Sequence, residues 1–180
     1  MASSKADTRI LIVDDDVGVR DTMHEYIQTV GYSAKAVCSA EEALELMGKE
    51  NFHVVITDIM LPVMGGLELT KLIKKASTSD VIVMTGYSDN YSYEEAINIG
   101  ASDFVIKPVR LGELMLRLKR VLKERELTNE RIRMMEKLQE LAITDGLTKL
   151  YNSRSFYSQL ESEIDRSNRY QHPLTLLLLD

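Results

Sequence analysis

The feature of this chain that most constrains its fold is a series of short apolar runs, each followed at once by polar residues. The runs end at four junctions: Val13 to Asp14, Thr57 to Asp58, Met84 to Thr85, and Ile106 to Lys107. Because the runs are rich in β-branched residues and are separated by helix-length segments, they predict parallel strands joined by crossover helices. In an open α/β sheet, the residues just past the carboxyl ends of the strands converge on one crevice. The sequence therefore predicts a single polar site assembled from these junctions.

The alternation of strands and helices extends through the first part of the chain. Strands are predicted over residues 9–13, 33–37, 53–58, 81–85 and 104–106, and helices over residues 17–30, 40–50, 67–75 and 92–99. Gly65 and Gly66 favour a turn before the third helix, and Gly100 favours the end of the fourth. This order predicts an α/β fold with a doubly wound, five-stranded parallel sheet, for which the right-handed crossover rule leaves few topologies.

The aspartates at the first and third strand tips suit a metal-dependent reaction. Asp14 and Asp15 are neighbouring like charges, an arrangement that is favourable only when a cation or a lysine lies between them. Clustered carboxylate oxygens are suitable ligands for Mg²⁺. Asp58 ends its strand, and carboxylates can act as nucleophiles that form acyl phosphates. We therefore expect phosphoryl transfer to Asp58, whereas Asp16 is explained as the N-cap of the following helix.

The remaining strand tips offer groups that can bind phosphoryl oxygens. Thr85 and Gly86 place a hydroxyl beside an unhindered N–H, and Lys107 adds an amine. The Lys107-Pro108 peptide bond can be cis at modest cost, which would direct the lysine into the crevice. Taken singly, Thr85 is an ordinary strand former and Lys107 an ordinary surface lysine. The prediction therefore rests on their position beside the aspartates.

Composition and charge exclude several other classes of function. The formal net charge of -6 argues against a nucleic-acid binder, because phosphate contacts need a basic face. Cys38 is the only cysteine, so an internal disulfide is excluded, and we expect Cys38 to be a buried small hydrophobic residue. The first residues lack a signal-peptide pattern, and the apolar tract at 174–179 is too short to cross a bilayer. We expect a soluble cytoplasmic protein that binds neither nucleic acid nor membrane.

A long helix is predicted over residues 111–142, where proline is absent and Leu, Met, Glu, Lys and Arg are mixed. A helix of about 30 residues is roughly 45 Å long, more than a domain of this size offers as a packing surface. Two heptad-spaced apolar stripes with a shift between them favour a coiled coil with a stutter. The stripes contain Leu111, Leu114, Leu118 and Val121, and then Leu127, Met134, Leu138 and Leu141.

We expect this stalk helix to form a parallel two-stranded coiled coil with a second copy of the chain. Arg125, Thr128 and Gln139 interrupt the seam. The zipper would therefore be weak alone, and the preceding domain could bias it. The alternative is a helix that packs only on its own domain.

A second unit is predicted after Thr144. Residues 145–152 favour a turn, residues 153–170 an amphipathic helix, and residues 174–179 a buried strand that ends at Asp180. An isolated strand leaves its backbone donors and acceptors unpaired. We therefore expect residues 144–180 to be the incomplete start of a domain.

Residues 9–122 resemble the receiver domain of two-component response regulators. Residues in that family's order and spacing carry the resemblance: Asp14, Asp15, Asp58, Thr85, Phe104, Lys107 and Pro108. The resemblance implies a flavodoxin-like fold with strand order 2-1-3-4-5. It also implies that Asp58 accepts a phosphoryl group from a phosphohistidine on a sensor histidine kinase. Mg²⁺ would be held by Asp15, Asp58 and the main-chain carbonyl of Met60, with Asp14 supporting it through water.

The same resemblance implies how the signal leaves the site. Lys107, Thr85 and Gly86 would bind the phosphoryl oxygens. Thr85 and Phe104 would form a switch that remodels the fourth helix, the fifth strand and the fifth helix. Tyr87 and Met60 occupy positions that flank the site, and their bulk implies restricted access of water to the phosphoryl group.

The tail resembles the opening of the GGDEF diguanylate cyclase domain. The matching residues are Asp145 to Thr148, Leu150 to Asn152, Arg154 and Phe156, whereas Ser153 replaces the family's usual arginine. Asp180 matches the family's first metal-binding aspartate. The glycine-glycine-acidic signature, the guanine-binding residues and the second metal ligand are absent, so we expect no cyclase activity from this piece. The expected organisation is a receiver at 1–122, a stalk helix at 111–143 and a cyclase fragment at 144–180.

The leading hypothesis is a phosphorylation-switched signalling module that controls a diguanylate cyclase. It would dimerise through the stalk and through the face between the receiver's fourth and fifth helices. One alternative is a phosphohydrolase of the haloacid-dehalogenase type, since Asp14 and Asp16 form an Asp-x-Asp pair, although the supported nucleophile is Asp58 on the third strand. A passive dimerisation scaffold, which would not respond to acetyl phosphate or beryllofluoride, is the other alternative.

Overall fold

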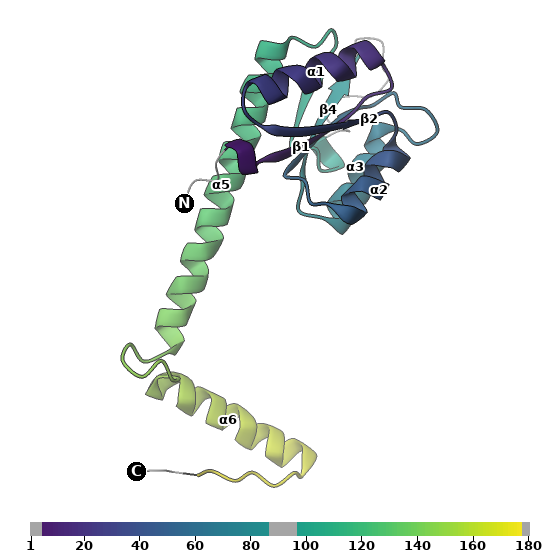
Figure 1. Cartoon of the computed structure of the whole chain (residues 1–180). Helices are drawn as coiled ribbons and strands as arrows, with labels where there is room; N and C mark the ends of the chain where they lie inside the picture. Colours follow the sequence, from purple (N-terminus) through teal and green to yellow (C-terminus); the bar gives the residue numbers. More distant parts are fainter. Residues whose placement is uncertain (1–4, 87–96, 178–180) are drawn as a thin grey trace. The chain divides into compact units, whose positions relative to one another are not determined.

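The computed structural model describes residues 5–86 and 97–177, and its first unit, residues 1–126, is an α/β domain (Figure 1). Among the described residues the sheet holds five parallel strands in the order β2-β1-β3-β4-β5. They are β1 (Arg9–Val13), β2 (Ser33–Val37), β3 (Val54–Asp58), β4 (Asp80–Thr85) and β5 (Asp103–Ile106). The predicted doubly wound fold and its strand order are confirmed, and each predicted strand end lies within one residue of the observed end.

Helices cover both faces of the sheet (Figure 1). The helices of this unit are α1 (Val17–Thr29), α2 (Ala40–Lys49), α3 (Gly66–Ala76) and the first part of α5 (Leu111–Ile143). A short 3₁₀ turn, η1 (Lys5–Asp7), precedes β1. Most of the helix expected over residues 92–99 lies outside the described residues.

Two apolar cores lie on the two faces of the sheet, because successive strand residues point to opposite sides. On β1, Ile10 and Ile12 pack with α1 and α5, whereas Leu11 and Val13 pack with α2 and α3. All four side chains are fully buried, and each such burial stabilises the fold by roughly 1.5–3 kcal/mol. Burial on both faces explains why the strands read as continuous apolar runs that end abruptly in polar residues.

Local sequence signals start the helices next to the strand tips. The Asp16 carboxylate caps α1 by accepting a hydrogen bond from the Val19 amide at 3.1 Å. At the start of α3, a Cβ on Gly66 would lie 1.8 Å from the carbonyl oxygen of Asp58. Only glycine permits this approach, so Gly66 fixes the loop that follows Asp58 against the end of β3.

The first half of α5 packs on the sheet of its own chain. Leu114, Leu118 and Val121 are buried in the core cluster that also contains residues of α1. These residues were predicted to lie in a seam between two copies, and that part of the coiled-coil prediction is wrong. The physical reason is that this face of the sheet needs a second covering helix beside α1, and an apolar stripe with helical spacing suits a sheet as well as a partner helix.

Arg125 binds α5 to the start of β4, at the end of the sheet opposite the aspartates. Its guanidinium donates to the carbonyl oxygen of Thr78 and to Asp80 Oδ2, the latter at 3.0 Å. Arg125 was predicted to interrupt a dimer seam; instead it binds the start of β4. Beyond it, the large apolar side chains of α5 are exposed in the part of the chain that the structure describes: Leu127, Ile132, Met134, Met135, Leu138, Leu141 and Ile143.

The second unit, residues 127–180, contains the rest of α5, a turn and α6 (Ser153–Tyr170). Thr144 and Tyr151 form an isolated antiparallel bridge that closes the turn. Asp145 Oδ1 accepts hydrogen bonds from the amides of Leu147 and Thr148, at 3.1 and 2.9 Å. Asn152 then caps α6 by accepting from the Ser155 amide. The predicted turn and helix are therefore confirmed.

Two predictions outside the site are wrong. Residues 174–177 form no strand, because a strand needs a partner to pair its backbone groups and none of the described segments supplies one. Asp180 lies outside the described residues. Cys38 is exposed in the loop after β2, where its Sγ lies 3.4 Å from Glu42 Oε2, so it is not core filler. No helix in the described ranges is long and apolar enough to cross a bilayer.

Candidate functional site

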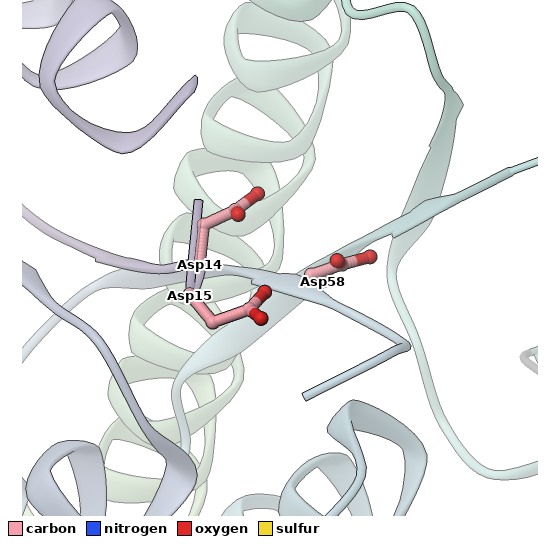
Figure 2. A group of neighbouring side chains, drawn as sticks. All are labelled: Asp14, Asp15 and Asp58. Atoms are coloured by element: carbon pink, nitrogen blue, oxygen red, sulfur yellow. The ribbon is translucent and has the colours of Figure 1, made fainter. Parts of the chain in front are cut away.

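Three aspartates meet at the carboxyl ends of β1 and β3 (Figure 2). One carboxylate oxygen each from Asp14, Asp15 and Asp58 lies within 4.8 Å of the others. The two strands are neighbours in the sheet, so their tips lie side by side. Asp14 and Asp58 are buried, whereas Asp15 is exposed. The cluster therefore has two carboxylates inside the domain and one that faces solvent.

Lys107 joins the two buried aspartates from the end of β5. Its Nζ lies 2.7 Å from Asp58 Oδ2 and 3.0 Å from Asp14 Oδ2. The Lys107 amide donates to the Thr85 carbonyl at 2.7 Å, which extends the pairing of β4 and β5 into the site. The Lys107–Pro108 peptide bond is cis. The structure thus brings together the lysine and the aspartates that the strand tips predicted.

Burial and the opposite charges of the neighbouring groups set the pKa values of Asp14 and Lys107. Burial raises the pKa of Asp14, although hydrogen bonds from Lys107 and from the Asp16 amide act in the opposite direction. Burial opposes the charge on Lys107, but the hydrogen bonds to Asp58 and Asp14 and the negative charges of these two carboxylates together outweigh burial, so the pKa of Lys107 is raised. With every group ionised, three carboxylates and one ammonium leave a net charge of -2. An all-oxygen donor set with this charge fits a hard divalent cation such as Mg²⁺.

Backbone and side-chain contacts hold Asp14 rigidly. Asp14 Oδ1 accepts from the Asp16 amide at 2.9 Å, and Arg20 donates to the Asp14 carbonyl oxygen at 2.9 Å. Sequence reasoning missed Arg20, as it missed the close approach of Gly66 to Asp58. The available signal was the place of Arg20 in the first turn of the helix that follows Asp14, because side chains in a helix tilt towards its N-terminus.

The other predicted site residues surround the cluster. Thr85 ends β4 half-buried, and its hydroxyl donates to the Gly86 carbonyl oxygen at 3.3 Å. The Met60 side chain is 58% exposed, just after Asp58 in the chain. Phe104 lies on β5 opposite Val83 of β4. Tyr87 lies outside the described residues. The functional roles predicted for these residues stay predictions.

The comparisons with known proteins agree with this geometry. The family model for the response regulator receiver domain matches residues 10–119. The chain belongs to the response regulator receiver family. Residues 142–180 match the family model of the diguanylate cyclase GGDEF domain. Both resemblances found in the sequence are therefore confirmed.

Individual relatives share the receiver portion. The chain is 34% identical over 114 residues to the transcriptional regulatory protein CrdR of Helicobacter pylori, which covers 62% of this chain and 54% of that protein. It is 37% identical over 117 residues to a cyclic di-GMP phosphodiesterase of Thermotoga maritima, covering 64% of this chain and 31% of that protein. The chain spans about half the length, or less, of the curated relatives it matches.

A solved structure gives the same picture. The CheY-like receiver domain protein from Methanospirillum hungatei is 34% identical, with a TM-score of 0.61, and the match covers 67% of this chain and 98% of that one. Receiver domains of this family bind Mg²⁺ at an acidic cluster and are phosphorylated by histidine kinases. The present chain has such a cluster in Asp14, Asp15 and Asp58.

Proposed function

We propose that Asp58 is the phosphoryl acceptor of this receiver domain. The observation that carries the proposal is the contact of Lys107 with both Asp58 and Asp14 at the tips of neighbouring strands. Asp58 is buried beside other carboxylates, and its side chain is held by an ammonium group that can also pair with an incoming phosphoryl oxygen. Asp14 is also buried and also contacts Lys107, but its other carboxylate oxygen accepts a hydrogen bond from the Asp16 amide. Asp58 is the residue that stands at the acceptor position implied by the resemblance to the receiver family.

The donor is a phosphohistidine on a sensor histidine kinase. A carboxylate oxygen of Asp58 attacks the phosphorus atom, an O–P bond forms, and the P–N bond to the imidazole breaks. The imidazole nitrogen leaves with the electron pair and takes up a proton. Lys107, Thr85 and the Gly86 amide contact the oxygens of the transferred group, and Lys107 balances part of their charge.

Asp14, Asp15 and Asp58, together with the main-chain carbonyl of Met60, would hold Mg²⁺ beside the acceptor. When bound, the metal supplies positive charge that offsets the repulsion between the carboxylates and the phosphoryl oxygens. Asp15→Ala should therefore weaken Mg²⁺ binding severely, whereas Lys107→Ala should bind Mg²⁺ nearly as well as the native chain and fail to switch. Equal loss of metal affinity in the two variants, measured by titration calorimetry, would contradict this division of roles.

Incubation with acetyl phosphate and Mg²⁺ tests the acceptor directly. We expect one phosphoryl group per chain by intact mass spectrometry, and none on Asp58→Asn. Asp16→Asn is the matched control, because asparagine also caps helices and Asp16 lies in the same loop as the metal ligands. Labelling of Asp58→Asn at the native level would show that another residue accepts the group.

We further propose that the second half of α5 pairs with the same segment of a second copy and carries the receiver's state to a diguanylate cyclase output. The support is the exposed apolar stripe beyond Glu126 and the GGDEF match that follows it. Cyclases of this family need two chains to face each other, so a dimeric stalk is a direct means of control. Phosphorylation would favour the dimer or change its register.

Sedimentation velocity with and without beryllofluoride tests the pairing, together with cysteine crosslinking. Cys38 is exposed and must first be replaced by serine. Leu138→Cys on the apolar stripe should crosslink in a beryllofluoride-dependent way, whereas Glu136→Cys, on another face of the helix, should not. A monomer in both states, or equal crosslinking at both positions, would contradict the proposal.

Family membership favours this signalling role over the two alternatives. A phosphohydrolase would turn over p-nitrophenyl phosphate, and a passive scaffold would dimerise without any response to beryllofluoride. Either result, obtained with the native chain, would replace the function proposed above.

A further inference from the structure

Arg117 of α5 contacts Asp103 and Phe104 at the start of the edge strand β5, and Glu113 of its own helix. Its guanidinium carbon lies 4.9 Å from the centre of the Phe104 ring. Its NH1 donates to Asp103 Oδ1 at 3.0 Å, and its Nε and NH2 donate to Glu113 Oε1 at 3.1 and 2.8 Å. A guanidinium with every edge engaged has a fixed orientation, and a flat cation over an aromatic face is an attractive contact.

The position of β5 makes this arrangement possible. Asp103 and Phe104 are consecutive, so their side chains leave opposite faces of the strand. Because β5 is the last strand of the sheet among the described residues, Arg117 can bind Asp103 on the α5 side and also reach the Phe104 ring around the edge of the strand. Asp103, 2% exposed, also accepts a hydrogen bond from the Phe104 amide at 2.8 Å. Phe104 is therefore held at its backbone by Asp103 and at its ring by Arg117.

A second arginine provides an internal comparison. Arg120 NH2 lies 2.9 Å from Asp103 Oδ2, but this side chain is 65% exposed. Asp103 therefore has two cationic neighbours on α5. In the described contacts, Arg117 lies over the Phe104 ring and Arg120 does not.

We propose that Arg117 is a latch for Phe104, holding the ring in the unphosphorylated receiver and releasing it when Asp58 is modified. The inference rests on the proposed function, since it takes Phe104 as the aromatic member of the switch. The route to the site is short: Thr85 pairs with Ile106, two residues along β5 from Phe104, and the Lys107 amide donates to the Thr85 carbonyl. Release would also change how α5, the helix that continues into the stalk, is held to the sheet edge.

Fluorine NMR of the full chain labelled with para-fluorophenylalanine tests the latch. The sequence contains three phenylalanines. Phe52 is buried in the core and Phe156 belongs to the second unit, so both serve as reference signals, and loss of a peak in Phe104→Leu assigns the third. Beryllofluoride with Mg²⁺ is then titrated into the native chain, Arg117→Met and the control Arg120→Met. Arg117→Lys is included because it keeps a positive charge beside Asp103.

We expect the Phe104 signal of the native chain to move on saturation with beryllofluoride. In Arg117→Met the signal of the unligated protein should already lie towards the saturated position, and half-saturation should need about two- to fivefold less beryllofluoride, the ratio that a partly exposed cation–π contact supports. Arg117→Lys should show a smaller shift in the same direction, and Arg120→Met should match the native chain.

The possible results separate the latch from the function on which it rests. If beryllofluoride occupies the site, seen by its own fluorine signals, but the Phe104 signal does not move, the latch is wrong and the phosphoryl-acceptor proposal stands. If Arg120→Met shifts the signal as much as Arg117→Met, the charge on Asp103 and not ring stacking controls Phe104, and the latch is also wrong. If beryllofluoride does not bind the native chain, the proposed function itself fails.

Discussion

The two halves of α5 contain the same kinds of residue, yet the fold treats them differently. Leu118, in the first half, is 0% exposed, whereas Leu138, in the second half, is 66% exposed. The first half lies on the sheet of its own domain, and in the second half the apolar stripe is open in the described chain. The difference teaches that an apolar stripe specifies a face that must be covered but does not specify what covers it.

The largest expected effect comes from shortening one leucine in each half. Leu118→Ala should lower the free energy of unfolding by about 2–5 kcal/mol, because it removes buried contacts and leaves a cavity in the core. Leu138→Ala should change it by about 0.5 kcal/mol or less at concentrations where the chain is monomeric. Urea denaturation of the dilute protein measures both values. Equal losses in the two variants would break the comparison, because they would mean that the second half is also packed within one chain.

A smaller effect is expected where the first half of α5 ends. Arg125→Met removes the hydrogen bonds to Thr78 and Asp80, and because these contacts are partly exposed to solvent, together they should contribute about 1–2 kcal/mol. Amide hydrogen exchange should then quicken in residues 119–126. Arg131→Met is the control, because Arg131 is exposed on the same helix. Unchanged exchange in Arg125→Met would show that the buried leucines alone hold the helix end.

The smallest effect should appear in the pH dependence near Arg125. Burial lowers the pKa of His53, and the charges of Arg125 and Arg9 lower it further. Because the unfolded chain then binds the proton more readily, stability should fall as the pH drops below the ordinary histidine pKa of about 6.5. In the native chain, His53 Nδ1 accepts a hydrogen bond from the Arg9 amide at 3.0 Å. His53→Asn keeps an acceptor for this amide and removes the titrating group. The urea midpoint of the native chain should fall more between neutral and mildly acidic pH than that of His53→Asn; parallel profiles would contradict this assignment.

The site was largely accessible to sequence reasoning, because strand tips in a parallel sheet meet at one edge whatever the details of packing. That rule predicts that Asp14, Asp58 and Lys107 lie together. It did not reveal that Arg20 braces Asp14, or that Gly66 is required by its approach to the Asp58 carbonyl. Both depend on how a helix enters from the loop after a strand, a geometry that residue types alone do not encode.

The sequence by itself determined the parallel sheet and the polar groups at its edge, because alternating buried strands and crossover helices admit few arrangements. The strand order followed from the resemblance to the receiver family. Only the tertiary structure decided the surroundings of α5. It buried Leu118, attached Arg125 to the start of β4, and placed Arg117 over Phe104. Each of these contacts joins residues that are not neighbours in the chain. The reason is that helical periodicity states which face of a helix is apolar, while the partner of that face is selected by the space left uncovered when the sheet and its other helices have packed.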